Sequence, residues 1–345
     1  MKIKLLVFIT IFILFIFVSC TMDENETTVP EITSGEEIST EAETAAEYTT
    51  IPPAQGLEAE SPTENGDAVI IPGNSLSSDR CFYGAKSDTA STLTGLTPLE
   101  KVSFSLPGAD KISDKATEMI SHSYGIASGE QPHLISIQYQ QFFDEKNFDS
   151  VCLDTRTEEK VIYLTFDCGY ENGYTSKILD VLKEKNVPAA FFCTLPQIRD
   201  NGELIARMIN EGHIVGNHSV THPDFSALSA QEILEEVKGF DDYIRENFGY
   251  SSFYFRFPQG KYSEKALYVL NELGYKCVFW SLAYADWDLE AQKGAAYAYE
   301  TVLARIHPGA VILLHSVSPD NANALADIID AARARGYEFR ALEDM

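Results

Sequence analysis

The chain has 345 residues, enough for one large domain or two of ordinary size, and a formal net charge of −26. So acidic a protein repels nucleic acid and anionic lipid, so we expect no nucleic-acid partner and a neutral or zwitterionic substrate. The charge is uneven, because half of the 52 acidic residues but only nine of the 26 basic residues precede Lys160.

The first 20 residues have the order of a secretory signal. Two lysines precede an apolar run from Leu5 to Val18, which is shorter than the roughly 20 residues that span a bilayer. The run closes on Ser19-Cys20. A small residue before a cysteine resembles a bacterial lipobox, in which Cys20 becomes the lipidated first residue. We predict a lipoprotein signal peptide over 1–20, with an uncleaved membrane anchor as the alternative; both hold the chain at the membrane, outside the cytoplasm.

The next part of the chain is of low complexity. Residues 21–67 contain thirteen acidic residues and no Lys or Arg. Such a segment buries too little apolar surface to offset its chain entropy, so we predict a disordered acidic tether over 21–95. Residues 96–159, with a candidate helix at Ser113–Ser123, are predicted to form a preface segment that packs on the main domain.

From residue 160 onward, apolar strand-like runs alternate with helix-like segments. This alternation indicates a parallel β/α barrel or a doubly wound sheet of seven units. The predicted strands are Val161–Asp167, Ala189–Thr194, Ile214–His218, Phe253–Pro258, Cys277–Leu282, Val311–Ser316 and Tyr337–Leu342. The predicted helices are Thr175–Lys185, Glu203–Glu211, Ala230–Asn247, Ser263–Leu273, Glu290–Ile306 and Asn321–Arg335.

Five of these strands lead to a titratable or hydrogen-bonding side chain. Isolated buried charges cost several kcal/mol, so a packing core has no use for them. The carboxyl ends of parallel strands meet at one edge, where ligands bind in such folds. The sequence therefore predicts a catalytic site at that edge. Its polar side chains come from Asp167, His218, Arg256, Asp286 and His315.

His218 and His222 form the segment HSVTH. Two imidazoles four residues apart can meet on one side of a turn and bind the same metal, for which zinc is suited. The alternative is two unrelated surface histidines. Pro223 prevents a helix from continuing past His222, so we expect the pair in a tight loop.

The remaining polar groups suit a metal-assisted hydrolysis. Asp167 is the candidate base for a metal-activated water, and His315 the candidate acid for the departing group. Arg256 stays charged and would orient a carboxylate. Two plainer roles remain open: Asp167 as a helix cap, and Arg256 in a structural ion pair.

From about residue 160 to the end, these motifs resemble the polysaccharide deacetylases, carbohydrate esterase family four (the NodB-homology domain). TFDCG, HSVTH, RFPQG, ADW and ILLH follow the family's order. The longer segments GYENGYT, GHIVGNHS and FWSLA are similar to the delta-lactam-biosynthetic de-N-acetylases of that family. The resemblance implies a distorted parallel (β/α) barrel of about seven units over 160–345.

The resemblance also implies a role for each matching residue. Asp167 would be the general base and His315 the general acid, with Arg256 orienting the base and Asp286 supporting Arg256. His218 and His222 would bind a divalent metal, expected to be zinc. Substrate-binding positions would include Pro258, Gln259, Trp287, Leu313, Tyr170, Glu171 and Asn172, with Trp287 and Leu313 lining the acetyl pocket.

This chain departs from the family pattern at two positions. In most members, the residue after the catalytic Asp is a second Asp that binds the metal. Here that residue is Cys168. The delta-lactam group also commonly lacks the second Asp. Cys168 either supplies a thiolate ligand or points away and leaves the two histidines with water; we lean to the ligand. Gln259 stands where an aromatic residue often follows the proline, and its backbone N–H can still assist an oxyanion.

We therefore expect a metal-dependent hydrolase that removes the N-acetyl group of muramic acid in peptidoglycan glycan strands, releasing acetate and leading to muramic delta-lactam. Two alternatives remain open: deacetylation of N-acetylglucosamine in peptidoglycan or chitin-like chains, and a non-catalytic lipoprotein that binds glycan. We expect a monomer anchored to the membrane through a lipid on Cys20.

Overall fold

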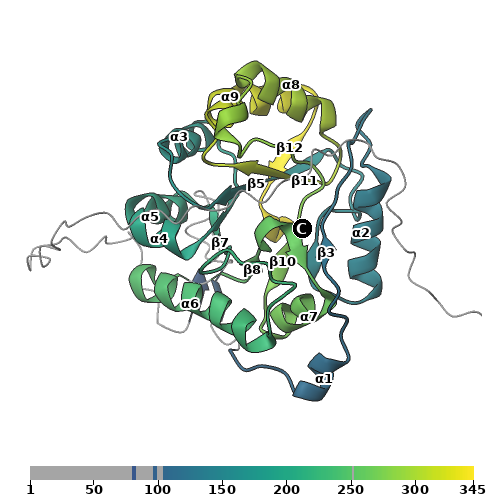
Figure 1. Ribbon diagram of the computed structural model, residues 1–345. Coiled ribbons are helices and arrows are strands. Elements are labelled where there is room, and N and C mark those ends of the chain that lie inside the picture. Colours follow the sequence, from purple (N-terminus) through teal and green to yellow (C-terminus); the bar gives the residue numbers. More distant parts are fainter. Residues whose placement is uncertain (1–79, 83–95, 99–103, 251) are drawn as a thin grey trace, which may run out of the picture. The chain divides into compact units, whose positions relative to one another are not determined.

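The computed structural model describes residues 80–82, 96–98, 104–250 and 252–345 (Figure 1). The predicted signal peptide and nearly all of the predicted tether lie outside these residues, so both stay predictions. Two short strands near residue 90, β1 (Arg80–Phe82) and β2 (Leu96–Pro98), pair antiparallel. In the part of the chain that the structure describes, no helix has the length and apolarity needed to cross a membrane.

A curled parallel sheet forms the centre of the fold. Seven of its strands are those that the sequence predicts: β5 (Val161–Cys168), β6 (Ala190–Cys193), β7 (Ile214–Asn217), β8 (Tyr254–Phe255), β10 (Lys276–Val278), β11 (Ala310–His315) and β12 (Glu338–Arg340). Their order is β11-β5-β6-β7-β8-β10, with β12 also paired to β5. Figure 1 shows helices around the outside of these strands. The predicted barrel of about seven units is confirmed.

The curl nearly closes. Leu282, beyond β10, forms a parallel bridge with Ile312 of β11, so the last part of the sheet returns to the first. A strand from the preface segment, β4 (Ser150–Val151), adds to the free side of β10. Sequence analysis missed this strand, because two residues are too few to show a period.

The helices follow the predicted positions closely. Those after β5 are α3 (Thr175–Lys185), α4 (Leu195–Asp200), α5 (Gly202–Asn210), α6 (Ala230–Phe248), α7 (Glu264–Glu272), α8 (Ala295–Arg305) and α9 (Pro319–Ala334). Ser229 begins α6 with a capping box, and the Ser263 side chain accepts a hydrogen bond from the N–H of Ala266 in α7. Helix α4 was not predicted, and α8 begins five residues later than expected.

The preface segment differs from its prediction. Instead of a helix at Ser113–Ser123, the chain forms a short helix α1 (Ala109–Ser113) and then strand β3 (Ile120–Ser121). Strand β3 pairs antiparallel with β9 (Lys261–Tyr262) of the main domain. Helix α2 (Leu134–Glu145) follows and packs Tyr139 and Phe143 into the core. A long-range pairing with β9 thus overrides the local helical pattern.

Strand β5 determines which side chains face the site. Its even-numbered residues, such as Phe166 and Cys168, belong to a buried cluster with side chains of α3, α5, α8 and α9. Its odd-numbered residues face the inside of the curl, where Val161 and Tyr163 pack. Since side chains alternate along a strand, Asp167 also lies on the inner face, at the carboxyl end. The whole strand is buried on both faces, as its composition predicts.

Candidate active site

Asp167 and Arg256 form the buried ion pair at the carboxyl edge of the sheet. Arg256 Nη1 donates to Asp167 Oδ1 at 2.8 Å, and the arginine side chain is fully buried. Arg256 also donates from Nε to the carbonyl of Val278 at 2.9 Å. Burial opposes ionisation of Asp167, but the charge of the neighbouring Arg256 outweighs it and lowers the pKa of Asp167. Asp167 is therefore a carboxylate at neutral pH.

Thr165 is a second partner of Arg256 that sequence analysis missed. Its hydroxyl donates to the carbonyl of Ile312 at 2.6 Å and accepts from Arg256 Nη2 at 2.9 Å. Thr165 lies two residues before Asp167, so both side chains face inward. The spacing of Thr165 and Asp167 was visible in the sequence, but the contact of both side chains with the distant Arg256 was not.

His218 and His222 come together in a loop directly after β7. Their ring centroids lie 4.9 Å apart and the rings are nearly perpendicular. His218 Nε2 lies 3.6 Å from Asp167 Oδ2, so the imidazole pair and the carboxylate share one edge of the sheet. The predicted tight loop is present: Ser219 and His222 both have positive φ, of 75° and 59°. Such backbone strain persists only where the surroundings hold it.

Two side chains outside the motif hold this loop. Glu236 of α6 accepts the backbone N–H groups of Val220 and Thr221, at 2.9 and 2.8 Å, and the Thr221 hydroxyl at 2.6 Å. Asn217 accepts the N–H of Ser219 at 2.8 Å. Sequence analysis missed Glu236, because its sequence context does not distinguish it from an acidic side chain that only contacts solvent on a helix surface.

His315 pairs with Asp286, which corrects a prediction. We expected Asp286 to support Arg256. Instead its Oδ1 lies 2.7 Å from His315 Nδ1 and its Oδ2 accepts the backbone N–H of His315 at 2.7 Å. Asn321 of α9, also missed, donates to the same carboxylate. Burial disfavours the imidazolium, but Asp286 outweighs burial and raises the pKa of His315. The His315 side chain remains 23% exposed, so a substrate can reach it.

Cys168 does not reach this site. It lies on the outer face of β5, in the buried cluster beneath the helices, whereas Asp167 lies on the inner face. Its register partner on β6 is Cys193, and burial, together with a hydrogen bond from the Cys193 S–H to Cys168, raises the pKa of the Cys193 thiol. The predicted thiolate ligand is therefore wrong, because strand alternation turns the side chain away from the two histidines.

The predicted substrate-binding residues divide into exposed and structural ones. Tyr170, Gln259 and Trp287 are exposed, whereas Pro258 and Leu313 are buried. Leu313 lies two residues before His315 on β11, and so on the same face. Their contacts with substrate stay predictions.

Glu171 and Asn172 mainly hold their own loop. Glu171 accepts the N–H of Gly173 at 2.6 Å and that of Thr175 at 3.4 Å, as an N-terminal cap of α3 does. Asn172 donates to the carbonyl of Val317 at 2.9 Å. The loop after β5 is thereby tied to the loop after β11.

The donor chemistry of the histidine pair fits a metal ion. The carbonyl of Arg256 lies 2.8 Å from His218 Nδ1 and can only accept, so Nδ1 carries the proton and the Nε2 lone pair is left for a ligand bond. Burial lowers the pKa of both rings, that of His222 to about 3 with help from His218, so both are neutral. Among the described residues, no three His, Cys, Asp or Glu side chains form a ligand cluster. Two imidazoles plus oxygen ligands is the set that fits.

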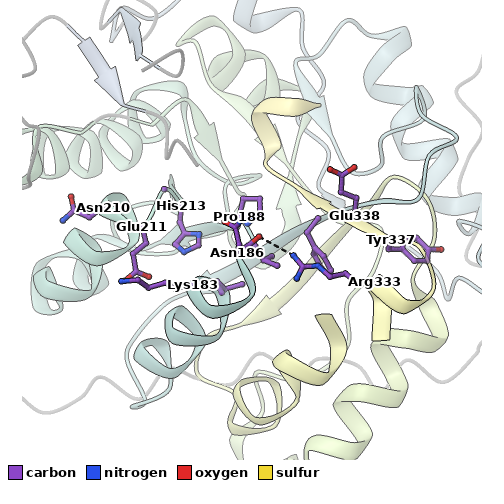
Figure 2. Close-up of a pocket in the computed structure, with 13 residues that line it drawn as sticks. Lys183, Asn186, Pro188, Asn210, Glu211, His213, Arg333, Tyr337 and Glu338 are labelled. Atoms are coloured by element: carbon purple, nitrogen blue, oxygen red, sulfur yellow. Dashed lines mark hydrogen bonds and ion pairs between the residues drawn. The ribbon is translucent and has the colours of Figure 1, made fainter. Parts of the chain in front are cut away.

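A pocket of about 500 Å³ lies elsewhere, at the loops that precede β6, β7 and β12 (Figure 2). It is lined by residues such as Lys183, His213 and Arg333 and by none of the predicted site residues. His213 is almost fully buried, and its Nδ1 accepts the N–H of Ala189 at 3.2 Å. These loops join the amino ends of the strands, so this pocket lies at the edge opposite the catalytic groups.

Comparison with known proteins identifies the domain. The family model described as polysaccharide deacetylase matches residues 154–278. Over 190 residues, the chain is 47% identical to the peptidoglycan-N-acetylmuramic acid deacetylase PdaA of Bacillus subtilis, covering 55% of this chain and 72% of the relative. It is 50% identical over 188 residues to an uncharacterised 30.6 kDa protein of Geobacillus stearothermophilus, covering 54% and 71%. The chain belongs to the polysaccharide deacetylase family.

The solved structure of Bacillus subtilis PdaA, a family 4 carbohydrate esterase, supports the same assignment. It matches with a TM-score of 0.63 and 42% identity, covering 66% of this chain and 97% of that one. As a polysaccharide deacetylase, this protein is a hydrolase acting on amide bonds. The resemblance found in its motifs is therefore confirmed at the level of the family and the fold.

Proposed function

We propose that this protein removes the N-acetyl group from N-acetylmuramic acid in peptidoglycan, releasing acetate and leaving an amine from which muramic delta-lactam forms. The observation that carries the proposal is that one edge of the sheet holds both a base and an acid. The base is an ionised Asp167 held by Arg256, and the acid is His315, whose pKa Asp286 raises. Similarity to PdaA supports muramic acid as the sugar.

The two groups divide the proton transfers between them. Asp167, with its lowered pKa, accepts the proton of the attacking water. Arg256 holds the carboxylate in place and cannot compete for the proton. His315, whose protonated form Asp286 favours, donates a proton to the amine nitrogen as the carbon–nitrogen bond breaks. Water and the neutral amide together give acetate and an ammonium group on the sugar, so atoms and charge balance.

Members of this family depend on a metal. His218 and His222 would hold it, and we propose zinc, which imidazoles suit. A bound divalent ion lowers the pKa of water and polarises the acetamide oxygen. The chain's own contribution is to keep both imidazoles neutral and to fix the His218 ring through Arg256.

We also propose that the protein works outside the cytoplasm, anchored through a lipid on Cys20. The signal-like order of residues 1–20 supports this, as does a substrate that lies in the cell wall. Mass spectrometry of the membrane fraction would show a diacylated Cys20 peptide; the peptide of an unprocessed N-terminus would contradict it.

The function is tested by incubating the full chain, with added zinc, with peptidoglycan glycan and measuring acetate. Digestion of the product and HPLC with mass spectrometry then locate the loss of acetyl. We expect loss from muramic acid. Loss from glucosamine alone would replace the muramic assignment with the glucosamine alternative, and no acetate from wild type beyond that from the Asp167→Asn control would support the non-catalytic alternative.

A further inference from the structure

The loop after Arg256 is held in a strained conformation. Gln259, which is not a glycine, has φ 58° and ψ 8°, and Gly260 follows with φ 65°. A left-handed residue other than glycine persists only when its surroundings over-determine it, and such residues gather at functional sites. Gln259 also carries the backbone N–H that, on the family resemblance, can assist an oxyanion. What holds Gln259 therefore matters for catalysis.

The preface segment holds the loop that contains Gln259 and Gly260. The backbone N–H of His122 donates to the carbonyl of Gly260 at 2.9 Å, directly after the strained residue. From there β3 and β9 pair antiparallel, with Ile120 opposite Tyr262. Any side chain at position 260 would bring its Cβ to 2.9 Å from Trp280 Cη2 and 3.3 Å from His122 Cβ, so the loop packs tightly against both.

The His122 side chain extends this hold to the ion pair. Its Nε2 donates to the carbonyl of Trp280 at 2.8 Å, while Arg256 Nη2 donates to the preceding carbonyl, that of Phe279, at 3.2 Å. The two side chains therefore hold neighbouring peptide groups of the segment after β10. The His122 ring lies 4.8 Å from the Phe279 ring and 5.0 Å from that of Trp280.

We propose that His122, together with β3, is a positioning residue for the deacetylation site: it fixes Gln259 in its left-handed conformation and steadies the segment on which Arg256 rests. His122 does not touch the reacting atoms. It acts through Gly260 and Trp280, whose carbonyl groups accept its two hydrogen bonds. The proposal rests on the proposed deacetylase activity, and assigns to the preface segment a part in catalysis rather than in stability alone.

The test compares three variants of the full chain. His122→Phe keeps a ring and removes the donor to Trp280. His122→Gln keeps an N–H at a similar reach, so it should restore the bond. His213→Phe is the matched control, because His213 is also a buried histidine whose ring nitrogen binds a backbone group, at the opposite edge of the sheet. Acetate release gives kcat and KM, and thermal unfolding gives stability.

We expect His122→Phe to lower kcat about 10- to 100-fold with KM within about three-fold, since a small misplacement of catalytic geometry acts on the transition state. His122→Gln should recover most of kcat. His213→Phe should lose comparable thermal stability and keep the wild-type kcat. A wild-type kcat in His122→Phe, or an equal loss of kcat in His213→Phe, would overturn the proposal.

A fourth variant covers the case in which His122→Phe does not fold. The Tyr139 hydroxyl donates to the carbonyl of Ser121 in β3 at 3.0 Å, and Tyr139→Phe keeps the ring but removes that bond. We expect faster amide hydrogen exchange at Gly260, Lys261 and Tyr262 than in wild type; unchanged exchange there would overturn the proposal. Hydrogen exchange needs no substrate, so it tests the positioning proposal even if the wild-type protein releases no acetate. Absence of acetate release would refute the proposed function and not the positioning role.

Discussion

Strand β5 places Asp167 on the inner face of the sheet and Cys168, the next residue, on the outer face. Strand β6 does the same: the ring of Phe192 lies 4.2 Å from the Arg256 guanidinium on the inner side, and Cys193 lies on the outer side beside Cys168. The inner face thus holds charges that compensate one another. The outer face holds thiols that behave as small apolar groups.

The difference shows that burial alone does not make a group functional. On the outer face, burial raises the pKa of the Cys193 thiol, so it stays protonated and inert. On the inner face, opposite charges outweigh burial, lowering the pKa of Asp167 and raising that of His315. Neighbouring residues of one strand therefore have different roles, one in catalysis and the next in packing. Substitutions on the two faces can test this difference.

The largest effect is expected on the inner face at Asp167. Asp167→Asn removes the base but keeps the side chain's shape, so kcat for acetate release should fall about 10³-fold. Circular dichroism should show an unchanged fold. Activity within ten-fold of wild type would mean that Asp167 is not the base.

Asp286→Asn should have the next largest effect. It removes the charge that raises the pKa of His315, so kcat should fall about 100-fold. Because the acid works only when protonated, wild-type kcat falls as pH rises through the His315 pKa. With that pKa lowered in the variant, the fall should move to lower pH. A high-pH limb that stays in place would contradict the assignment of His315.

Thr165→Val tests a smaller contribution on the same face. The variant keeps the shape but removes the hydroxyl between Arg256 and Ile312. Because Arg256 loses one of its acceptors, we expect kcat to fall about 10-fold. The free energy of unfolding should fall by about 1–3 kcal/mol. Unchanged kinetics would show that Arg256 needs no support from Thr165.

Cys168→Ser provides the outer-face counterpart and the smallest effect on activity. Since the thiol points beneath the helices, zinc content and kcat should match wild type, while stability falls by about 1 kcal/mol. Inductively coupled plasma mass spectrometry measures the zinc. Loss of zinc in this variant would restore Cys168 as a ligand.

Local patterns sufficed for much of the fold and for part of the site. The run Val161–Asp167 gave β5 to within one residue, because a strand buried on both faces reads as continuous apolar sequence. The predicted helix starts at Ala230 and Ser263 agree with those of α6 and α7 to within one residue. The site residues Asp167, His218, Arg256 and His315 were found from their places at strand ends, and the structure brings them together.

By itself, then, the sequence determined the alternation of strands and helices and the polar residues at the strand ends, since both follow from local periodicity and from the cost of burying charge. Only the tertiary structure decided which of those residues pair. Asp286 holds His315 rather than Arg256, Cys168 faces away from the histidines, and His122 reaches Trp280 across 158 positions. Such partners depend on strand register and on contacts between distant segments, which no local pattern encodes.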